Sequence, residues 1–281
     1  MIKTDTPIFI GGAGRSGTTL IRVILDSHPR IACGPELRIT PTLAYLWEQY
    51  NQRLDVLKSY GITKESNAKT FQNLYFALIS RYLNTTQKRR IAEKTPGNCK
   101  VFPQLRQIFP DSPLIHIIRD GRDVVASLRK QNWIDLRTGE PMVETVDTVK
   151  AIKHWKESVT LGRKIKNQKD QNYFEIRYES LIESPELELK KLFKFLNEDW
   201  DPKVLSFHEI SRNLAFEASS NQVNKPFYKT SIGRFRKALQ LEDGLKIDDI
   251  AGDLLIDLGY TLDNSWIKSL QPNQKNHSYK I

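Results

Sequence analysis

A glycine- and hydroxyl-rich segment, Gly11-Gly-Ala-Gly-Arg-Ser-Gly-Thr-Thr-Leu20, is the feature that most constrains the fold of this chain. It follows a short apolar run, Pro7–Ile10, which is typical of a buried strand. After Gly17 the apolar residues recur at helical spacing, which predicts a helix that ends before His28-Pro29. Glycines allow successive backbone N–H groups to converge on an anion at the start of a helix. The segment therefore predicts a phosphate-binding loop between a strand and a helix.

The loop differs from the G-x-x-x-x-G-K-[ST] pattern of nucleoside triphosphatases. Gly17-Thr18-Thr19 stands where the lysine and the magnesium-binding hydroxyl would be. Ser16 and the two threonines supply hydroxyl donors, and Arg15 supplies a fixed positive charge. These residues suit one terminal phosphate better than a metal-bound triphosphate, so no metal is expected.

The rest of the chain alternates strand-like and helix-like segments. This pattern predicts an α/β fold with a parallel sheet flanked by helices on both faces. Ser184 is expected to cap a helix that has Pro185 at its first position. We expect a single domain over residues 1–270 and a polar tail over 271–281. Further strands are expected at Arg90–Ala92, Leu114–Ile118 and Tyr173–Ile176, and helices at roughly 41–60, 67–84, 98–109 and 144–168.

Composition sets a few further limits. No apolar run approaches the roughly 20 residues of a membrane helix, and the first residues lack the apolar core of a signal peptide, so a cytoplasmic protein is expected. Cys33 and Cys99 have no metal-ligand spacing and are expected to be unpaired thiols, although a bridge between them stays open. The net charge of +10 favours an anionic ligand without identifying it.

A second anion-binding segment is indicated around residue 119. Arg119 ends a predicted strand, and Ser127 lies about two turns into the helix that follows. Ligands of doubly wound folds collect at these carboxyl ends of strands. The alternative is a solvated ion cluster of Arg119 with Asp120 or Asp123.

Three stretches, Phe9–Arg22, Leu25–Pro29 and Cys33–Arg38, together resemble the sulfotransferases that use 3′-phosphoadenosine 5′-phosphosulfate (PAPS), and among them the protein-tyrosine sulfotransferase branch most. Shorter islands of similarity continue to about residue 237. The resemblance implies a P-loop-like α/β sheet, PAPS as sulfuryl donor, adenosine 3′,5′-bisphosphate (PAP) as product, and no metal.

The resemblance also implies roles for individual residues. Glu36 corresponds to the family's general base, and Lys94 to a lysine that stabilises the leaving group together with Arg15. Arg119 and Ser127 correspond to the pair that holds the 3′-phosphate. The implied donor-binding residues are Arg15, Ser16, Gly17, Thr18, Thr19, Arg119, Ser127, Tyr178, Ser219, Gly233 and Arg234.

The acceptor is expected to be a hydroxyl, with the tyrosine of an acidic peptide or protein favoured. Arg38 and Thr42 occupy substrate-binding positions of the tyrosine branch. Pro35, Thr42 and Ala92 depart from that branch, which would have glutamate, arginine and, in secreted-pathway relatives, a bridged cysteine there. The alternatives are a small alcohol, phenol, carbohydrate or lipid acceptor and, more remotely, a P-loop kinase or a non-enzymatic anion-binding protein. No nucleic acid partner is expected, and a homodimer is possible.

Overall fold

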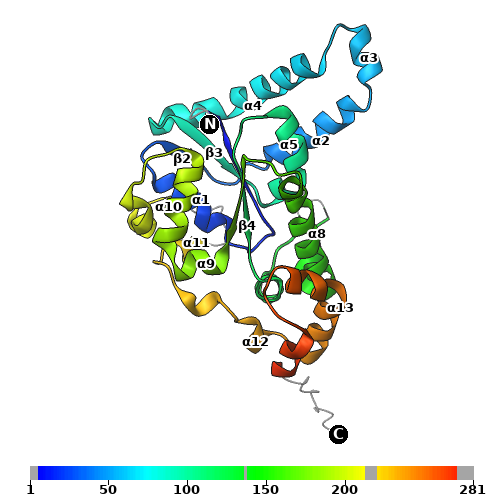
Figure 1. Ribbon diagram of the computed structural model, residues 1–281, viewed down its shortest axis with the longest axis vertical. Helices are drawn as coiled ribbons and strands as arrows, with labels where there is room; N and C mark the ends of the chain where they lie inside the picture. The colour runs from blue at the N-terminus through cyan, green and yellow to red at the C-terminus, as the bar shows by residue number, and fades with distance from the viewer. Residues whose placement is uncertain (1–5, 136–137, 213–219, 271–281) are drawn as a thin grey trace. The chain divides into compact units, whose positions relative to one another are not determined.

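The computed structural model describes residues 6–135, 138–212 and 220–270 (Figure 1). Ser219 and the tail 271–281 lie outside the described residues. The chain forms two compact units, Met1–Ile118 with Ser158–Tyr228, and Arg119–Glu157 with Lys229–Ile281. The single domain over residues 1–270 stays a prediction.

The first unit contains a parallel sheet. In the described residues it has the strand order β2-β3-β1-β4-β5, and all neighbours are parallel. The predicted parallel α/β sheet is thus confirmed. The short strand β2 was not predicted. The strands are β1 (Ile8–Gly11), β2 (Ile31–Cys33), β3 (Arg90–Lys94), β4 (Leu114–Ile118) and β5 (Tyr173–Arg177).

Helices cover both faces of this sheet, as predicted (Figure 1). On one face lie α1 (Thr18–Ser27), α9 (Tyr178–Glu183) and α10 (Pro185–Leu196), and on the other α2 (Ile39–Asn51), α4 (Lys64–Thr86) and α5 (Phe102–Ile108). The first unit also holds α3 (Leu54–Ser59), α11 (Ser220–Val223), and the 3-10 helices η1 (Pro96–Val101) and η2 (Pro202–Glu209). Helix α8 (Thr148–Asn167) begins in the second unit and ends in the first.

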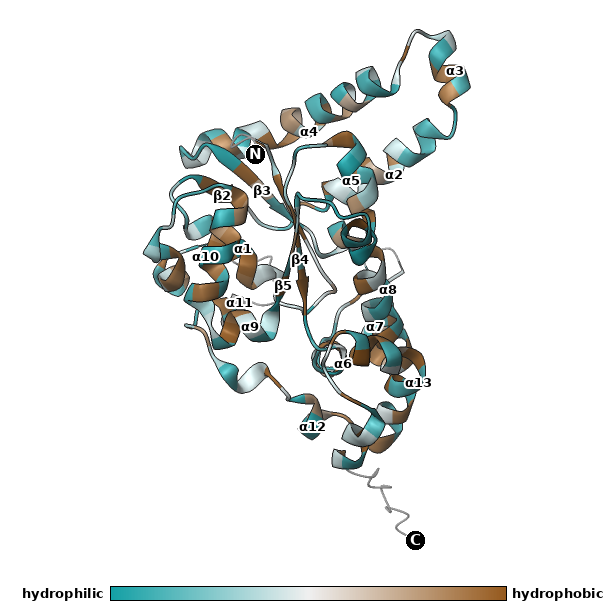
Figure 2. Cartoon of the chain, viewed as in Figure 1, coloured by the Kyte–Doolittle hydropathy of each residue, from teal (hydrophilic) through white to brown (hydrophobic). Residues whose placement is uncertain are grey.

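The main core of the first unit lies between the sheet and α2, α4 and α5. Phe9 of β1 packs there with Tyr75 and Phe109, and Trp47 of α2 stacks edge-on against Phe71 of α4. Figure 2 shows the hydrophobic residues gathered on the strands and on the helix faces turned toward them. Each such fully buried side chain contributes about 1.5–3 kcal/mol. This core fixes the strands whose carboxyl ends carry the site.

The second unit is helical in its described residues. Its Arg122 lies over the rings of Phe235 and Trp266, with the guanidinium carbon 4.3 and 4.9 Å from the ring centroids. Arg122 also pairs with Asp120 at 2.7 Å, so its role is structural. The elements, besides the first part of α8, are α6 (Gly121–Leu128), α7 (Val143–Val146), η3 (Lys229–Ser231), α12 (Phe235–Ala238), α13 (Leu241–Asp257) and η4 (Asn264–Ser269).

Four local expectations need correction. The helix expected over 98–109 begins as the 3-10 helix η1 before α5, and the helix expected over 144–168 is two helices, α7 and α8, separated at Asp147. The helix expected over 41–60 is two helices, α2 and α3, separated by Gln52 and Arg53. Ser184 does precede α10 with Pro185 at the helix start, but its side chain makes no capping hydrogen bond. Pro185 alone therefore marks that start, because its fixed φ suits the first turn.

Candidate active site

The glycine loop joins β1 to α1, as predicted. Gly17 stands at the N-cap of α1 in the left-handed region, with φ 98°, and offers no side-chain cap. A Cβ on Gly17 would lie 2.6 Å from the ring of Tyr178, so the loop approaches this ring too closely for any side chain. Because α1 begins without a side-chain cap or an acidic residue in its first turn, its first N–H groups suit an anion.

Ser16 shows how the loop fits a phosphate. Its Oγ is buried and, among the described residues, has no hydrogen-bond partner. Leaving a buried hydroxyl unsatisfied costs about 1–3 kcal/mol, which a phosphate oxygen accepting its hydrogen bond would remove. Thr18 and Thr19 are buried next to it at the start of the helix. Arg15 is in the left-handed region and donates to Gln222 Oε1 at 3.4 Å.

The predicted base and the predicted leaving-group lysine are in contact. Lys94 Nζ lies 3.1 Å from Glu36 Oε2, and Arg38 Nε donates to Glu36 Oε1 at 2.9 Å. The side chain of Lys94 is only 1% exposed, whereas that of Glu36 is 22% exposed. Lys94 also pairs with Ile10, the residue before the glycine loop, across the parallel strands β3 and β1. The sheet therefore brings Glu36, Lys94 and the start of the loop to one edge.

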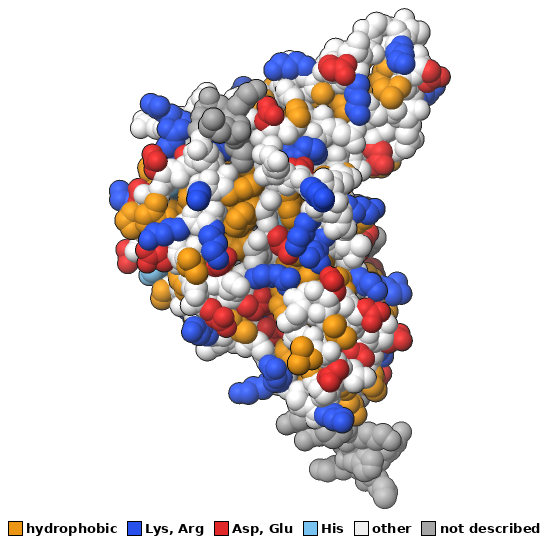
Figure 3. All heavy atoms as spheres, in the orientation of Figure 1, with side chains coloured by type: hydrophobic (Ala, Val, Ile, Leu, Met, Phe, Trp, Pro, Cys, Tyr) orange, Lys and Arg blue, Asp and Glu red, His pale blue; other side chains and the backbone are white. Residues whose placement is uncertain are grey.

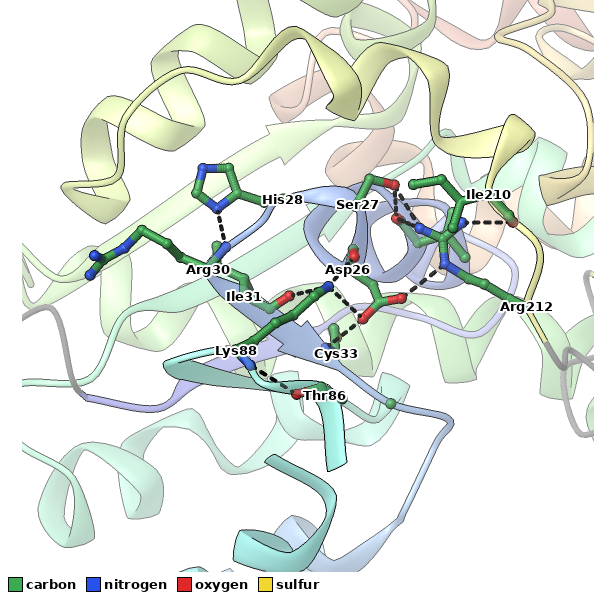
Figure 4. A network of polar contacts seen from close by, with 12 residues as sticks. Asp26, Ser27, His28, Arg30, Ile31, Cys33, Thr86, Lys88, Ile210 and Arg212 are labelled. Carbon is green, nitrogen blue, oxygen red and sulfur yellow. Dashed lines mark hydrogen bonds and ion pairs between the residues drawn. The ribbon is translucent and has the colours of Figure 1, made fainter. Parts of the chain in front are cut away.

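The loop that carries Glu36 is fixed where it leaves β2. The Cys33 N–H donates to Asp26 Oδ1 at 3.0 Å, and Arg22 Nε donates to the Gly34 carbonyl at 2.9 Å. Figure 4 shows that Asp26, near the end of α1, also accepts hydrogen bonds from the side chains of Lys88 and Arg212. These contacts hold α1 and β2 together, so the loop starts from a rigid point.

The same loop is fixed again where it enters α2. Arg38 is the N-cap of α2 in the left-handed region, with φ 58°, and its N–H donates to Thr95 Oγ1 at 3.2 Å. The hydroxyl of Thr95 in turn donates to Glu93 Oε1 at 2.5 Å. Glu93 is a buried carboxylate that sequence reasoning missed. Its only signal in the sequence is an acidic residue inside an otherwise buried strand.

The predicted 3′-phosphate residues lie in the second unit. Arg119 follows β4 directly in the chain, its Nη2 donates to the Ser231 carbonyl, and it lies 3.8 Å from Asp123. Asp123 accepts the N–H of Gly233 at 2.8 Å and that of Phe235 at 2.9 Å. Burial raises the pKa of Asp123, and the Arg119 charge opposes this. The predicted residues Arg119, Gly233 and Arg234, the N-cap of α12, are thus brought together by a carboxylate that sequence reasoning had considered only as an ion-pair partner.

The remaining predicted residues occupy different environments. Ser127 is buried on α6, and Tyr178 is buried at the start of α9 against the glycine loop. Thr42 is exposed on α2 with its hydroxyl 3.5 Å from the Arg38 carbonyl oxygen. Arg38 is 79% exposed, so these two residues face solvent beside Glu36.

The two cysteines are free and buried. Burial raises the pKa of both thiols, to about 12 for Cys99. Both are therefore protonated and chemically inert at neutral pH. Within the described residues, no group of three or more His, Cys, Asp or Glu side chains could hold a metal ion.

The drawn face of the molecule carries charges of both signs (Figure 3). On the face drawn in Figure 3, blue Lys and Arg side chains are interspersed with red Asp and Glu side chains. Such mixing differs from the single-sign stripe that follows a nucleic acid backbone. No helix in the part of the chain that the structure describes is long and apolar enough to cross a membrane.

Comparison with known proteins decides the family. A model described as the Sulfotransferase family matches residues 7–202. This chain belongs to the sulfotransferase family. Among curated relatives, Protein-tyrosine sulfotransferase A of Caenorhabditis elegans is 27% identical over 266 residues, covering 92% of this chain and 68% of the relative. Protein-tyrosine sulfotransferase 1 of Homo sapiens is 27% identical over 271 residues, covering 91% and 70%.

Solved structures support the fold of this sulfotransferase. The sulfotransferase domain of the Synechococcus PCC 7002 olefin synthase superposes with a TM-score of 0.57 at 24% identity, covering 89% of this chain and 96% of that one. A mouse sulfotransferase complexed with PAP superposes with a TM-score of 0.55 at 16% identity, covering 95% and 89%. The predicted fold and the prediction of a sulfotransferase enzyme are confirmed.

Proposed function

We propose that this sulfotransferase moves the sulfuryl group of PAPS to the tyrosine hydroxyl of a protein or peptide, with Glu36 as general base. The observation that carries the proposal is the contact between Glu36 and the buried Lys94 at the carboxyl edge of the sheet. It joins a proton acceptor and a cation beside a phosphate-binding loop. The relatives named protein-tyrosine sulfotransferases support tyrosine as the acceptor.

The residues of the first unit suit the 5′-phosphosulfate of the donor. In the first unit, Arg15, Ser16, Gly17, Thr18 and Thr19 would bind the 5′-phosphosulfate through hydroxyl groups, the arginine and the N–H groups that begin α1. Tyr178, whose ring packs on the loop, would line the nucleotide.

In the second unit, Arg119 and Ser127 would bind the 3′-phosphate, aided by Gly233 and Arg234. Arginine suits this role because its planar fork binds phosphate oxygens in pairs. Asp123 contacts both Arg119 and the Gly233 N–H, which keeps the arginine and the turn together. Ser219, also proposed to contact the donor, lies outside the described residues.

The chemistry follows from the groups at the edge of the sheet. When bound, PAPS supplies the sulfuryl group and a phosphate leaving group. Glu36 would accept the proton of the tyrosine hydroxyl, whose ordinary pKa of about 10 makes a base useful at neutral pH. Lys94 and Arg15 would donate hydrogen bonds to phosphate oxygens as negative charge develops there. Because Lys94 is nearly fully buried, its charge acts in a medium that screens it weakly.

The acceptor side is proposed to bind an acidic peptide. Arg38 is largely exposed and pairs with Glu36, so it can turn toward a carboxylate of the peptide without a large desolvation cost. Thr42 lies one helical turn further along α2 and would contribute a hydroxyl. A homodimer is also proposed, and light scattering of the purified chain measures it.

The acceptor is tested by a transfer assay with labelled PAPS. The acceptors are a peptide with a tyrosine flanked by Asp and Glu, the same peptide with phenylalanine, a neutral tyrosine peptide and a simple phenol. We expect transfer to the acidic tyrosine peptide and none to the phenylalanine peptide. Transfer to the phenol alone would refute the peptide acceptor and favour a small hydroxyl substrate.

The donor is tested by calorimetry. PAP should bind more tightly than AMP, and Arg119→Ala should remove most of that difference because it removes a 3′-phosphate contact. Arg129→Ala, at the exposed end of the same helix, is the matched control and should bind like the wild type. Equal affinity of the wild type for the two nucleotides would refute PAPS as the donor.

A further inference from the structure

Glu93 is a carboxylate enclosed in the first unit, one residue before Lys94 on β3. The residue is 5% exposed. It accepts hydrogen bonds from three neutral donors: Thr95 Oγ1 lies 2.5 Å from Oε1, and Asn98 Nδ2 and Thr40 Oγ1 lie 2.6 and 2.7 Å from Oε2. A buried carboxylate is costly unless such donors satisfy it. The three donors therefore surround the Glu93 carboxylate and offset the cost of burying it.

The donors to Glu93 come from the segments that carry the proposed chemistry. Thr40 lies in the first turn of α2, directly after the loop with Glu36 and Arg38. Thr95 follows Lys94, and its hydroxyl also accepts the Arg38 N–H at 3.2 Å. One carboxylate thus links the segment of the base to the segment of the lysine.

Asn98 extends the link to the glycine loop. Besides Glu93 Oε2, its Nδ2 also contacts the carbonyl oxygen of Ile10 at 3.1 Å. Ile10 lies in β1, which ends at Gly11, and it directly precedes the double glycine that opens the loop. The Gly12 N–H donates to the Pro96 carbonyl at 3.0 Å, a second bond between the same two segments.

We propose that Glu93 is a positioning residue of the sulfotransferase site, which sets the Glu36–Lys94 distance through Thr40, Thr95 and Asn98. The proposal rests on the proposed function. Arg38 shows why such a device is needed. Its left-handed backbone, with φ 58°, is unfavourable for a side-chain-bearing residue and is held by the hydroxyl of Thr95. Without Glu93 that hydroxyl loses its fixed orientation, and the loop with Glu36 loses its anchor.

Charge explains why a carboxylate is required. A carboxylate accepts all three donors at once, whereas glutamine at this position has one acceptor oxygen and an NH₂ group that would face a donor. Burial raises the pKa of Glu93, and the hydrogen bonds of Thr95, Asn98 and Thr40 together with the charge of Lys94 oppose that rise. The three donors are thus matched to the ionised form.

Glu93→Gln is the first test, with Glu198→Gln as the matched control. Glu198 is also a buried carboxylate, but it pairs with Arg90 at the opposite end of β3. We expect Glu93→Gln to lower kcat by about 10- to 100-fold, as a misplaced reacting group does, while the Kd for PAP stays near the wild-type value. Glu198→Gln should lower thermal stability, but it should not lower kcat selectively while the Kd for PAP stays unchanged.

A second pair of variants keeps the test valid if Glu93→Gln does not fold. Thr40→Val removes the hydroxyl that donates to Glu93 and should lower kcat, whereas Thr40→Ser keeps the hydroxyl and should restore it. A role in packing alone would give the opposite order, because valine keeps the shape of threonine whereas serine loses its methyl group. Equal kcat for valine, serine and wild type would overturn the proposal.

The reactivity of Lys94 gives a readout that does not need activity. An amine-reactive reagent, followed by mass spectrometry, compares the labelling rate of Lys94 with that of Lys58, which is exposed on α3. Lys94 should react slowly in the wild type, and about 10-fold faster in Glu93→Gln if the segment opens more easily. A wild type without transferase activity refutes the proposed function alone. Unchanged Lys94 labelling in both Glu93→Gln and Thr40→Val refutes the positioning role.

Discussion

Replacing Glu36 with glutamine tests the proposed base most directly. The amide keeps the size of the side chain, and its oxygen can still accept from Lys94 Nζ, which lies 3.1 Å from Glu36 Oε2. Arg38 then faces the NH₂ group, but it is 79% exposed and can bond to water instead. The folding cost should thus be near that of one weakened hydrogen bond, about 1 kcal/mol, rather than the 3–5 kcal/mol of a broken buried ion pair.

The catalytic cost of this change should be much larger. A general base contributes about 10²- to 10⁴-fold. At 1.36 kcal/mol per tenfold change, this raises the activation free energy by about 3–5 kcal/mol. Single-turnover transfer with saturating PAPS measures it, and calorimetry with PAP should show nearly unchanged binding. The exposed Glu65 of α4 supplies the control Glu65→Gln. A loss below about 10-fold in Glu36→Gln, under 1.4 kcal/mol, would refute Glu36 as the base.

Further predictions concern the second unit, the loop and the sheet. Asp123→Asn should weaken PAP by about 10-fold but leave AMP unchanged in calorimetry, because it disturbs Arg119; an equal loss for AMP would contradict this. Gly17→Ala should lower the free energy of unfolding by at least about 1–2 kcal/mol, because φ is 98° and a Cβ would collide with the ring of Tyr178. Calorimetry should then show a Tm lower by about 2–4 °C per kcal/mol. Burial lowers the pKa of His116 from 6.5 to about 3. Between these values the unfolded chain binds the extra proton, so the free energy of unfolding should fall by about 2 kcal/mol from pH 6.5 to 5. Urea titrations measure this fall, and His116→Gln should lack it.

The sequence predicted best those features of the fold and the candidate site that are formed by residues close together in the chain. The glycine loop was predictable because the strand before it and the helix after it have different apolar periods. The place of Arg119 at the end of a strand was predictable in the same way, since it follows the apolar run of β4 directly. Both features depend on residues that are neighbours in the chain, so one sequence suffices to recognise them.

Features that depend on distant residues were missed. Strand β2 has three residues, too few to show an alternating pattern, and it exists because Ile31, Ala32 and Cys33 pair with β3. The break between α2 and α3 contains no glycine or proline to signal it. Glu93 meets Thr40 across 53 positions of the chain, and no local pattern announces that meeting.

Glu93 and Lys94 are neighbours on β3, but they contact different partners. Consecutive residues of a strand point to opposite faces, although the charge of Lys94 still lowers the pKa of Glu93. The neutral donors Thr40, Thr95 and Asn98 satisfy Glu93, and the carboxylate that Lys94 contacts at 3.1 Å is Glu36 on another segment. A pair between Glu93 and Lys94 would instead compete with the contact between Lys94 and Glu36 on which the proposed function rests. Thr40→Val combined with Thr95→Val should lower activity more than either change alone, because each removes one hydrogen-bond donor to Glu93.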